Sequence, residues 1–309
     1  VGGRPRRHGP TAARIYHHLM VSRAPGNDAP TETTNPPLAG SPVERLRPRT
    51  GPQILDAGFE IIRYRAGRIA VLLAVLHGPF FAASLWMTHQ SGNGWFSLLI
   101  IRRLWDGPRF ELAASAEVWW LTGSLACSLF GEMLFGVGLS TLVRHWLEGT
   151  DATAGSVLRT TGRRLPVILS VWLVALVVKA AGLALCGVGI LLVLPHLSIL
   201  AQVMSFERGN VASWIGRSRQ LVNRASERAL FLTLMAPLLS FGALWTLRAG
   251  AVGGIGDVEQ FTTVMGVVVT LVLLVARTSA MVLFYLDIRV RTEGLDLALR
   301  APEALGPRS

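Results

Sequence analysis

Five ionisable side chains lie inside long apolar segments of the sequence. They are His77, Glu132, Lys179, His196 and Arg277. Such a side chain is costly to place at the depth of a membrane, so it usually faces other polar groups and marks a site or path for a polar ligand. These residues are therefore the first candidates for chemistry inside the protein.

Four of the five fall at a similar depth. At about 1.5 Å per helical residue, His77, Glu132, His196 and Arg277 lie about 12 to 16 Å from the arginine-rich ends of their segments. Lys179 is deeper, at about 21 Å, and its long side chain can snorkel outward. The layer of four predicts either a site for a transported ion or headgroup, or a structural Glu132–Arg277 ion pair beside two hydrogen-bonded histidines. An unpaired charge there costs about 2.5–3.5 kcal/mol, so pairing is expected in both cases, and we favour the structural pair.

The segments that carry these residues have the length and composition of membrane spans. The chain is 51% hydrophobic and 16% charged, whereas soluble domains carry about 25% charged residues. Its apolar residues gather in blocks of about 20, the length that crosses a hydrocarbon core about 30 Å thick. We therefore predict an all-α, polytopic membrane helical bundle. Its six transmembrane helices are expected at about 69–87, 118–143, 165–186, 187–206, 229–247 and 261–286.

The distribution of basic residues predicts the orientation. Most of the 30 Lys and Arg residues lie before the first span, in 144–164, in 207–228 or after the last span. By the positive-inside rule, both termini are predicted to be cytoplasmic, in a multi-pass protein of the cell inner (cytoplasmic) membrane. The net charge of +11 then faces anionic lipid headgroups on the cytoplasmic side. Because the basic residues stand at helix ends without interleaved aromatic residues, no nucleic-acid partner is predicted.

The ends of the chain differ in composition from its middle. Residues 1–46 form a basic, Pro-rich tail that is predicted to be disordered, because it holds too few apolar residues to bury. Met20 is a candidate start. Residues 301–309 are predicted to be a second disordered tail, which leaves 47–300 as the membrane domain. The first 50 residues contain no signal-peptide core, so the first span is expected to act as an uncleaved signal anchor.

Three segments repeat one pattern: IIRYRAGRIAVLL (61–73), VLRTTGRRLPVIL (157–169) and LVNRASERALFLT (221–233). Each runs from an apolar pair through a polar or basic patch to an arginine at the start of a span. The pattern predicts three hairpin repeats, each consisting of an amphipathic cytoplasmic surface helix followed by two spans.

The surface helices have two predicted placements. In 54–66 the apolar residues share one helical face and the charged residues the other. Such a helix can lie at the lipid headgroups or pack against the cytoplasmic face of the bundle. The candidates for contact with headgroups at the interface are Arg63, Arg65, Arg68, Arg163, Arg164 and Arg228.

Two stretches at the ends of the domain resemble a known family. RPRTGPQILDAGFEIIR (47–63) is similar to the entry motif, and FYLDIRVRTEGLDLAL (284–299) to the closing motif, of actinobacterial multi-span proteins named after the membrane domain of glycerophosphoryl diester phosphodiesterases. The resemblance covers about 47–300 and implies a six-span membrane domain of a family without an established function. The phosphodiesterase itself is a barrel domain, and the chain leaves no room for it.

The sequence contains no motif typical of an enzyme. It has no Ser/His/Asp set, HExxH helix, Walker loop or metal-spaced Cys/His cluster, so we expect no catalytic residues, cofactor or metal. The first hypothesis is a non-enzymatic scaffold or assembly factor of the bacterial cell envelope, with other membrane proteins as candidate partners. The alternative is a transporter, or a protein that handles lipids or small amphiphiles at a polar site in the bundle. An intramembrane enzyme ranks third.

Overall fold

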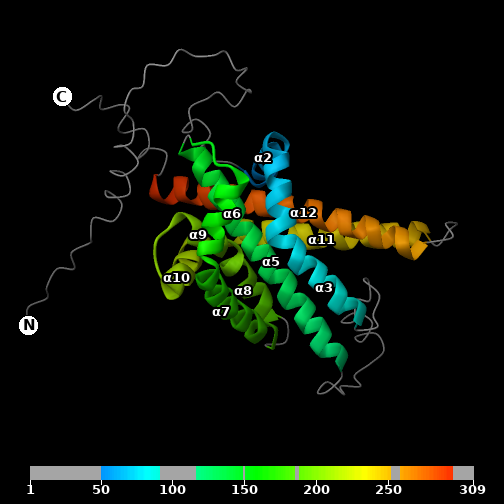
Figure 1. Cartoon of the computed structure of the whole chain (residues 1–309). Coiled ribbons are helices and arrows are strands. Elements are labelled where there is room, and N and C mark those ends of the chain that lie inside the picture. Colours follow the sequence, from blue (N-terminus) through cyan, green and yellow to red (C-terminus); the bar gives the residue numbers. More distant parts are fainter. Residues whose placement is uncertain (1–49, 91–115, 149, 185–187, 252–257, 295–309) are drawn as a thin grey trace, which may run out of the picture. The chain divides into compact units, whose positions relative to one another are not determined.

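The computed structural model describes residues 50–90, 116–148, 150–184, 188–251 and 258–294 (Figure 1). Every regular element within these ranges is a helix. Five helical segments are long and apolar enough to cross a membrane: Arg65–Gln90, Thr122–Leu147, Leu165–Gly182, Gly189–Phe206 and Val264–Glu293. The predicted all-α, polytopic helical bundle is thereby confirmed.

One predicted span does not match any of these five segments, and the two predicted tails lie outside the described residues. The fifth predicted span, 229–247, lies within helix α11 (Ser226–Ala251), which is not among the five segments. Its place in the membrane stays a prediction. The tails 1–46 and 301–309 lie outside the described residues.

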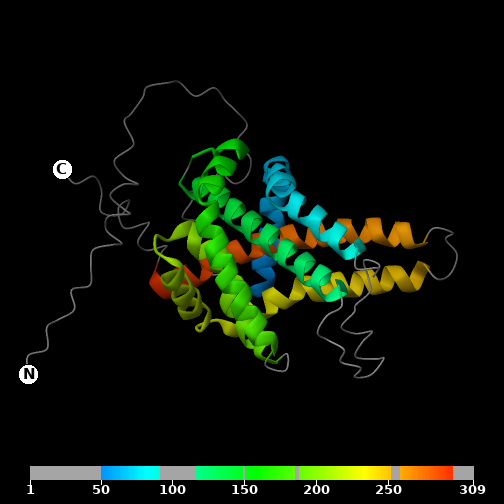
Figure 2. The ribbon, with the colours of Figure 1, turned by 60° about the horizontal axis from the view of Figure 1, so that its bottom comes forward.

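The described helices pair as three hairpins. The first joins α3 (Gly78–Gln90) to α5 (Ala116–Leu147), the second joins α7 (Leu165–Ala184) to α8 (Val188–Ser198), and the third joins α11 to α12 (Val258–Glu293). Figures 1 and 2 show α3 beside α5 and α11 beside α12 in both views. In the second hairpin, Gly182 allows a close approach, because a Cβ there would lie 3.2 Å from the backbone of Gly189.

A surface helix precedes each hairpin, as the repeat predicts. These helices are the first part of α2 (Gly51–Leu72), α6 (Ala154–Arg163) and α10 (Val211–Val222). The N-cap side chain of α6, Thr153, accepts a hydrogen bond from the backbone N–H of Ser156, and Asn210 does the same for Ser213 at the start of α10. These caps satisfy backbone donors that would otherwise lack partners, and they fix where each surface helix begins.

The first surface helix turns into the first span at Arg65. There the backbone leaves the helical region, with φ −125° and ψ 24°, and the chain continues through a π-helical turn, η1 (Leu73–His77), into α3. Before the kink, Gly58 packs against α12: a Cβ at Gly58 would lie 3.3 Å from the backbone nitrogen of Ala280. Of the two predicted placements, packing on the bundle is therefore observed, whereas headgroup contact by the outer face stays a prediction.

Burial separates the inner helices from the outer ones. In α5, nearly every residue from Phe130 to Val143 is buried, and α12 is buried in the same way between Leu274 and Val290. By contrast, α7 leaves large apolar side chains such as Leu173 and Val177 exposed. A hydrocarbon environment removes the cost of this exposure, so the outer face of α7 is suited to lipid.

Candidate functional site

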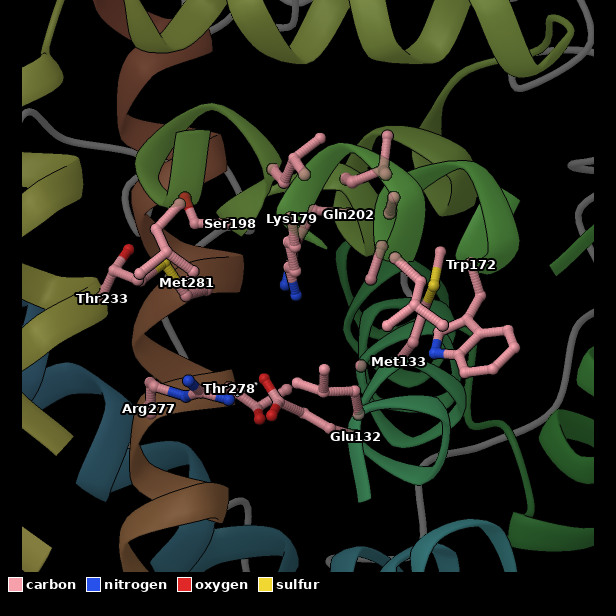
Figure 3. Close-up of a pocket in the computed structure, with 18 residues that line it drawn as sticks. Glu132, Met133, Trp172, Lys179, Ser198, Gln202, Thr233, Arg277, Thr278 and Met281 are labelled. Atoms are coloured by element: carbon pink, nitrogen blue, oxygen red, sulfur yellow. Dashed lines mark ion pairs between the residues drawn. The ribbon is translucent and has the colours of Figure 1, made fainter. Parts of the chain in front are cut away.

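A cavity of about 140 Å³ lies between the spans (Figure 3). Its walls come from α5, α7, α8, α9 (Leu200–Phe206), α11 and α12. Most lining side chains are apolar, but three carry ionisable groups: Glu132 on α5, Lys179 on α7 and Arg277 on α12. The cavity thus brings together charged groups from three helices that are far apart in the sequence.

Glu132 and Arg277 form an ion pair across the cavity. The pairing expected from their similar depth is confirmed. The pair is not sealed, because the Glu132 side chain is 32% exposed and that of Arg277 20% exposed. A structural pair enclosed in a core would be less exposed on both sides. Both groups line the cavity, so a ligand in the cavity would lie beside them.

Lys179 also points into this cavity. In Figure 3 its ammonium group projects toward the space beside the Glu132–Arg277 pair. The side chain therefore does not snorkel to the interface. Lys179 shares the inner face of α7 with Trp172, Ala175 and Leu176. The outer face of the helix carries exposed apolar residues such as Leu173 and Val177. In the described part of the chain, no ion pair or hydrogen bond reaches the ammonium group. Lys179 is also the only lysine of the sequence.

Two uncharged polar groups of the lining also lack hydrogen-bond partners among the described residues. One is the indole Nε1 of Trp172, and the other is Oε1 of Gln202, whose residue is only 2% exposed. A buried polar atom without a partner costs roughly 1–3 kcal/mol relative to one that is hydrogen-bonded. Both atoms are fully buried behind the cavity wall, so the Lys179 ammonium is the unpartnered donor that faces the open space.

The fourth span is broken beside the cavity. Helix α8 ends at Ser198 and α9 begins at Leu200, with Ile199 between them at φ −101° and ψ 12°. Pro195 lies inside α8 and lacks the N–H that would continue the ladder, and the Ser198 hydroxyl donates to the Pro195 carbonyl at 2.6 Å. The residues around the break, Ser198 to Gln202, include most of the α8–α9 lining.

The two histidines of the predicted layer lie elsewhere. His77 is buried between the first span and α5, where its ring stacks on Phe81 and where a Cβ on Gly131 would lie 2.8 Å from its Nδ1. The backbone carbonyl of His196 accepts a hydrogen bond from Ser218 of α10. Neither histidine lines the cavity. Of the four layer residues, the structure thus brings only Glu132 and Arg277 together there.

The arginines predicted to meet headgroups mostly contact protein groups. Arg65 and Arg68 both bind Asp151, and Arg68 also donates to the Ala152 carbonyl at 3.0 Å. Arg164 donates to the Met204 carbonyl at 3.3 Å, and Arg228 binds Asp287 at 3.1 Å. Arg63 and Arg163 are exposed. Lipid contact by any of the six stays a prediction.

The repeated arginine at the start of each span thus has a structural use. Arg68, Arg164 and Arg228 each tie the first span of a hairpin to a segment further along the chain. Hydrogen bonds from Arg68 and the positive charge of both Arg68 and Arg65 lower the pKa of the Asp151 carboxyl to about 2.

Two carboxylates complete these ties at the arginine-rich ends of the spans. The Asp287 side chain is 1% exposed and accepts hydrogen bonds from Arg228 and, at 2.9 Å, from Arg291. The partly buried Glu207 accepts from Arg217 and from the Tyr285 hydroxyl. Asp287 lies within the closing motif FYLDIRVRTEGLDLAL, but no role was predicted for it from the sequence. Its i,i+4 spacing from Arg291 was the available signal.

Gln202 and Trp172 are further lining residues that the sequence analysis missed. Gln202 could have been found as an amide in the apolar run 187–206. Trp172 had no comparable signal, because tryptophan in a span is usually an apolar filler or an interface anchor.

Comparison with known proteins adds no homologue: no family model matches the chain, and neither a curated protein nor a solved structure matches it. The resemblance of 47–63 and 284–299 to the actinobacterial membrane family therefore stays a prediction. Within the described residues, no group of three or more His, Cys, Asp or Glu side chains could hold a metal ion.

Proposed function

We propose that the protein binds a small amphiphile or polar solute in this cavity, as a transporter or lipid-handling protein does. The observation that carries the proposal is the local break at Ile199, within the segment Gly189–Phe206, beside a cavity that contains charged groups. Non-helical backbone at membrane depth is tolerated only where it is buried in protein or lines a cavity. In many transporters, spans with a longer interruption form the substrate site.

The π-helical turn at Leu73–His77 is a second irregularity. It lies in the first span, on the opposite side of α5 from the cavity, with His77 against Gly131 and thus next to Glu132 in the sequence. Turns of this type occur frequently at functional sites. Two spans thus carry a local irregularity, one on each side of the segment of α5 that contains Glu132. This arrangement is more typical of a binding site than of a uniformly packed bundle.

The size of the cavity limits what it can hold. At about 140 Å³ it compares with an engineered apolar cavity of about 150 Å³ that binds one benzene molecule. A single headgroup or a small solute fits, whereas a whole lipid does not. If the ligand is an amphiphile, its tail lies outside the cavity, where the exposed apolar face of α7 is available.

The scaffold hypothesis explains these features less well. A scaffold needs no unpartnered polar groups in its interior, and replacing a buried ion pair by apolar residues is often neutral or stabilising. Scaffolding of envelope assembly remains the competing function, and it predicts that the cavity is dispensable.

A cavity-filling substitution tests the proposal. Leu176→Trp places a larger side chain on the cavity wall, whereas Leu173→Trp makes the same change on the exposed face of the same helix. Native mass spectrometry of protein extracted in mild detergent should detect a bound small molecule in the wild type and in Leu173→Trp, and no such molecule in Leu176→Trp. Absence of any adduct from the wild type, or equal retention by all three proteins, would contradict the proposal.

We further propose that both termini face the cytoplasm in the cell inner membrane. The arginine–carboxylate contacts of Asp151, Glu207 and Asp287 support this orientation, because they gather at the arginine-rich ends of the spans. Reporter fusions after Ser309 and within 144–164 or 207–228 should read cytoplasmic, and fusions near Asn93 and Asp257 exterior. An exterior C-terminus would contradict six crossings.

A further inference from the structure

The charged groups of the cavity do not cancel. Its lining contains two cationic side chains, Lys179 and Arg277, and one carboxylate, Glu132. Glu132 is already engaged by Arg277. The positive charge that remains belongs to Lys179, which projects into the open space of the cavity (Figure 3).

The hydrogen-bonding groups of the cavity, like its charge, favour an anionic ligand that accepts hydrogen bonds. The buried Trp172 N–H can only donate, and no acceptor among the described residues receives it. The Lys179 ammonium likewise has three N–H donors and accepts nothing. Figure 3 places the indole nitrogen of Trp172 on the side of its ring that faces the cavity. The Trp172 nitrogen is itself fully buried, so of the two donors only the Lys179 ammonium projects into open space.

We propose that the cavity binds one singly charged oxyanion group, a phosphate or carboxylate, held by the Lys179 ammonium. This inference rests on the proposed function and assigns the ligand class for that site. Oxyanions offer several acceptor oxygens around one charge, so one group can receive the N–H donors of Lys179 and balance the remaining positive charge. The Gln202 amide supplies a further polar contact on the α9 side.

The Glu132–Arg277 pair sets the specificity. Because Arg277 occupies the carboxylate of Glu132, the cationic part of a zwitterionic headgroup finds no free carboxylate in the cavity. A zwitterion would also leave the net charge of the cavity uncompensated. The site therefore favours a headgroup or solute with one net negative charge over a zwitterionic one.

The test uses the full chain, purified in a neutral maltoside detergent. Three probes are titrated at constant ionic strength: dioctanoyl-phosphatidylglycerol, which is anionic, dioctanoyl-phosphatidylcholine, which has the same chains but is zwitterionic, and inorganic phosphate. Binding is followed by the shift of the thermal unfolding midpoint. In parallel, the rate at which an amine-reactive reagent modifies Lys179 is measured by peptide mass spectrometry, which is simple to assign because the chain has no other lysine.

We expect phosphatidylglycerol to raise the unfolding midpoint and to slow Lys179 modification at least several-fold, with little effect of phosphatidylcholine. Lys179→Met should weaken the apparent affinity for phosphatidylglycerol about tenfold or more, whereas Lys179→Arg should keep most of it. If inorganic phosphate gives the same protection, the anion alone is the ligand. If only the lipid protects Lys179, the headgroup of an amphiphile is the ligand.

A control variant separates the cavity from the charged surface. Arg159→Met removes one charge from the exposed side of α6 and should leave phosphatidylglycerol binding unchanged. Equal weakening by Arg159→Met and Lys179→Met would place the lipid on the surface and overturn the inference. The labelling rate of the wild type decides the matter even if Lys179→Met does not fold.

The outcomes also distinguish this inference from the proposed function. Equal protection of Lys179 by phosphatidylcholine and phosphatidylglycerol would overturn the anion specificity, while a ligand in the cavity would still be supported. Failure of all three probes to protect Lys179 would overturn the anion inference, and the adduct lost in Leu176→Trp would then show whether another ligand class occupies the cavity.

Discussion

Charged side chains are arranged differently at the arginine-rich ends of the helices and in the cavity between them. At the arginine-rich ends, Asp151, Asp287 and Glu293 each bind two arginines. In the cavity, Glu132 binds one arginine and the ammonium of Lys179 is left over. The charged pairs at the helix ends join helices to each other, whereas the unpaired Lys179 ammonium in the cavity is available to a ligand.

Among the contacts at the arginine-rich ends, burial of the carboxylate distinguishes strong ion pairs from weak ones. The Asp287 side chain is 1% exposed and that of Asp151 is 66% exposed, although each binds two arginines. When a buried carboxylate loses its charge, little water can take its place beside its arginine partners. When an exposed carboxylate loses its charge, water can hydrate the arginines instead. The comparison therefore predicts a graded series of effects.

The largest loss of stability is expected for Asp287→Asn. Removing this charge leaves Arg228 and Arg291 without their shared partner. Because both arginines are more than a third exposed, we expect the low end of the cost of breaking a buried pair, about 3 kcal/mol. The free energy of unfolding in detergent measures the loss. Asp151→Asn is the matched control and should cost about 1 kcal/mol or less. Equal losses of unfolding free energy in the two variants would show that burial of the carboxylate does not determine how much these contacts stabilise the protein.

The Glu132–Arg277 pair should come next. Glu132→Ala leaves two cations in the cavity, whereas Arg277→Ala leaves a carboxylate that can be protonated. We therefore expect Glu132→Ala to lower folded yield and unfolding free energy more, by about 2.5–3.5 kcal/mol. The double variant Glu132→Leu/Arg277→Met should recover much of this stability, since replacing both partners is often nearly neutral.

Two further results of that experiment are informative. A double variant as unstable as the two single changes added together would mean that the residues are not coupled, which would contradict the pair. A double variant that regains stability but loses the bound small molecule would show that the pair serves the ligand site as well as the fold.

The smallest effect is a pH dependence caused by Asp151. Its folded-state pKa, about 2, lies below its ordinary value of 3.8. The contribution of Asp151 to stability is therefore fully present above about pH 4, and it is lost as the pH falls from about 4 to about 2. Because the group is exposed, the change should be about 1 kcal/mol or less. Acid unfolding of wild type and Asp151→Asn should differ above pH 4 and converge below pH 2. Parallel curves at all pH values would contradict this contribution.

Much of the fold could be predicted from the sequence. The apolar blocks gave the positions of five spans to within four residues, except that Val264–Glu293 extends seven residues beyond the predicted end at 286. Hydrocarbon thickness fixes the approximate length of such segments. The arginine pattern before each span predicted the three surface helices and hairpins. The kink at Arg65 and the break at Ile199 could not be located, since local backbone geometry depends on tertiary packing around Gly58 and Pro195.

The site was predicted only in part. Depth along each span grouped Glu132 with Arg277 correctly, but it carries no information on which way a helix is rotated. His77 and His196 therefore shared the predicted layer and yet do not line the cavity, while Lys179, whose side chain could have snorkelled outward, does line it. Rotation follows from packing, for example from Gly136 on α5, where a Cβ would lie 3.1 Å from the Cβ of Ala201.

The most direct measurement of the central distinction is the unfolding free energy of Lys179→Met in the absence of added ligand. If Lys179 is held for a ligand, removing its unmatched charge should leave stability unchanged or raise it, while binding of the anionic lipid is lost. If Lys179 is instead a structural partner within the bundle, Lys179→Met should destabilise the protein by an amount comparable to Glu132→Ala. That result would contradict the assignment of the cavity as a ligand site.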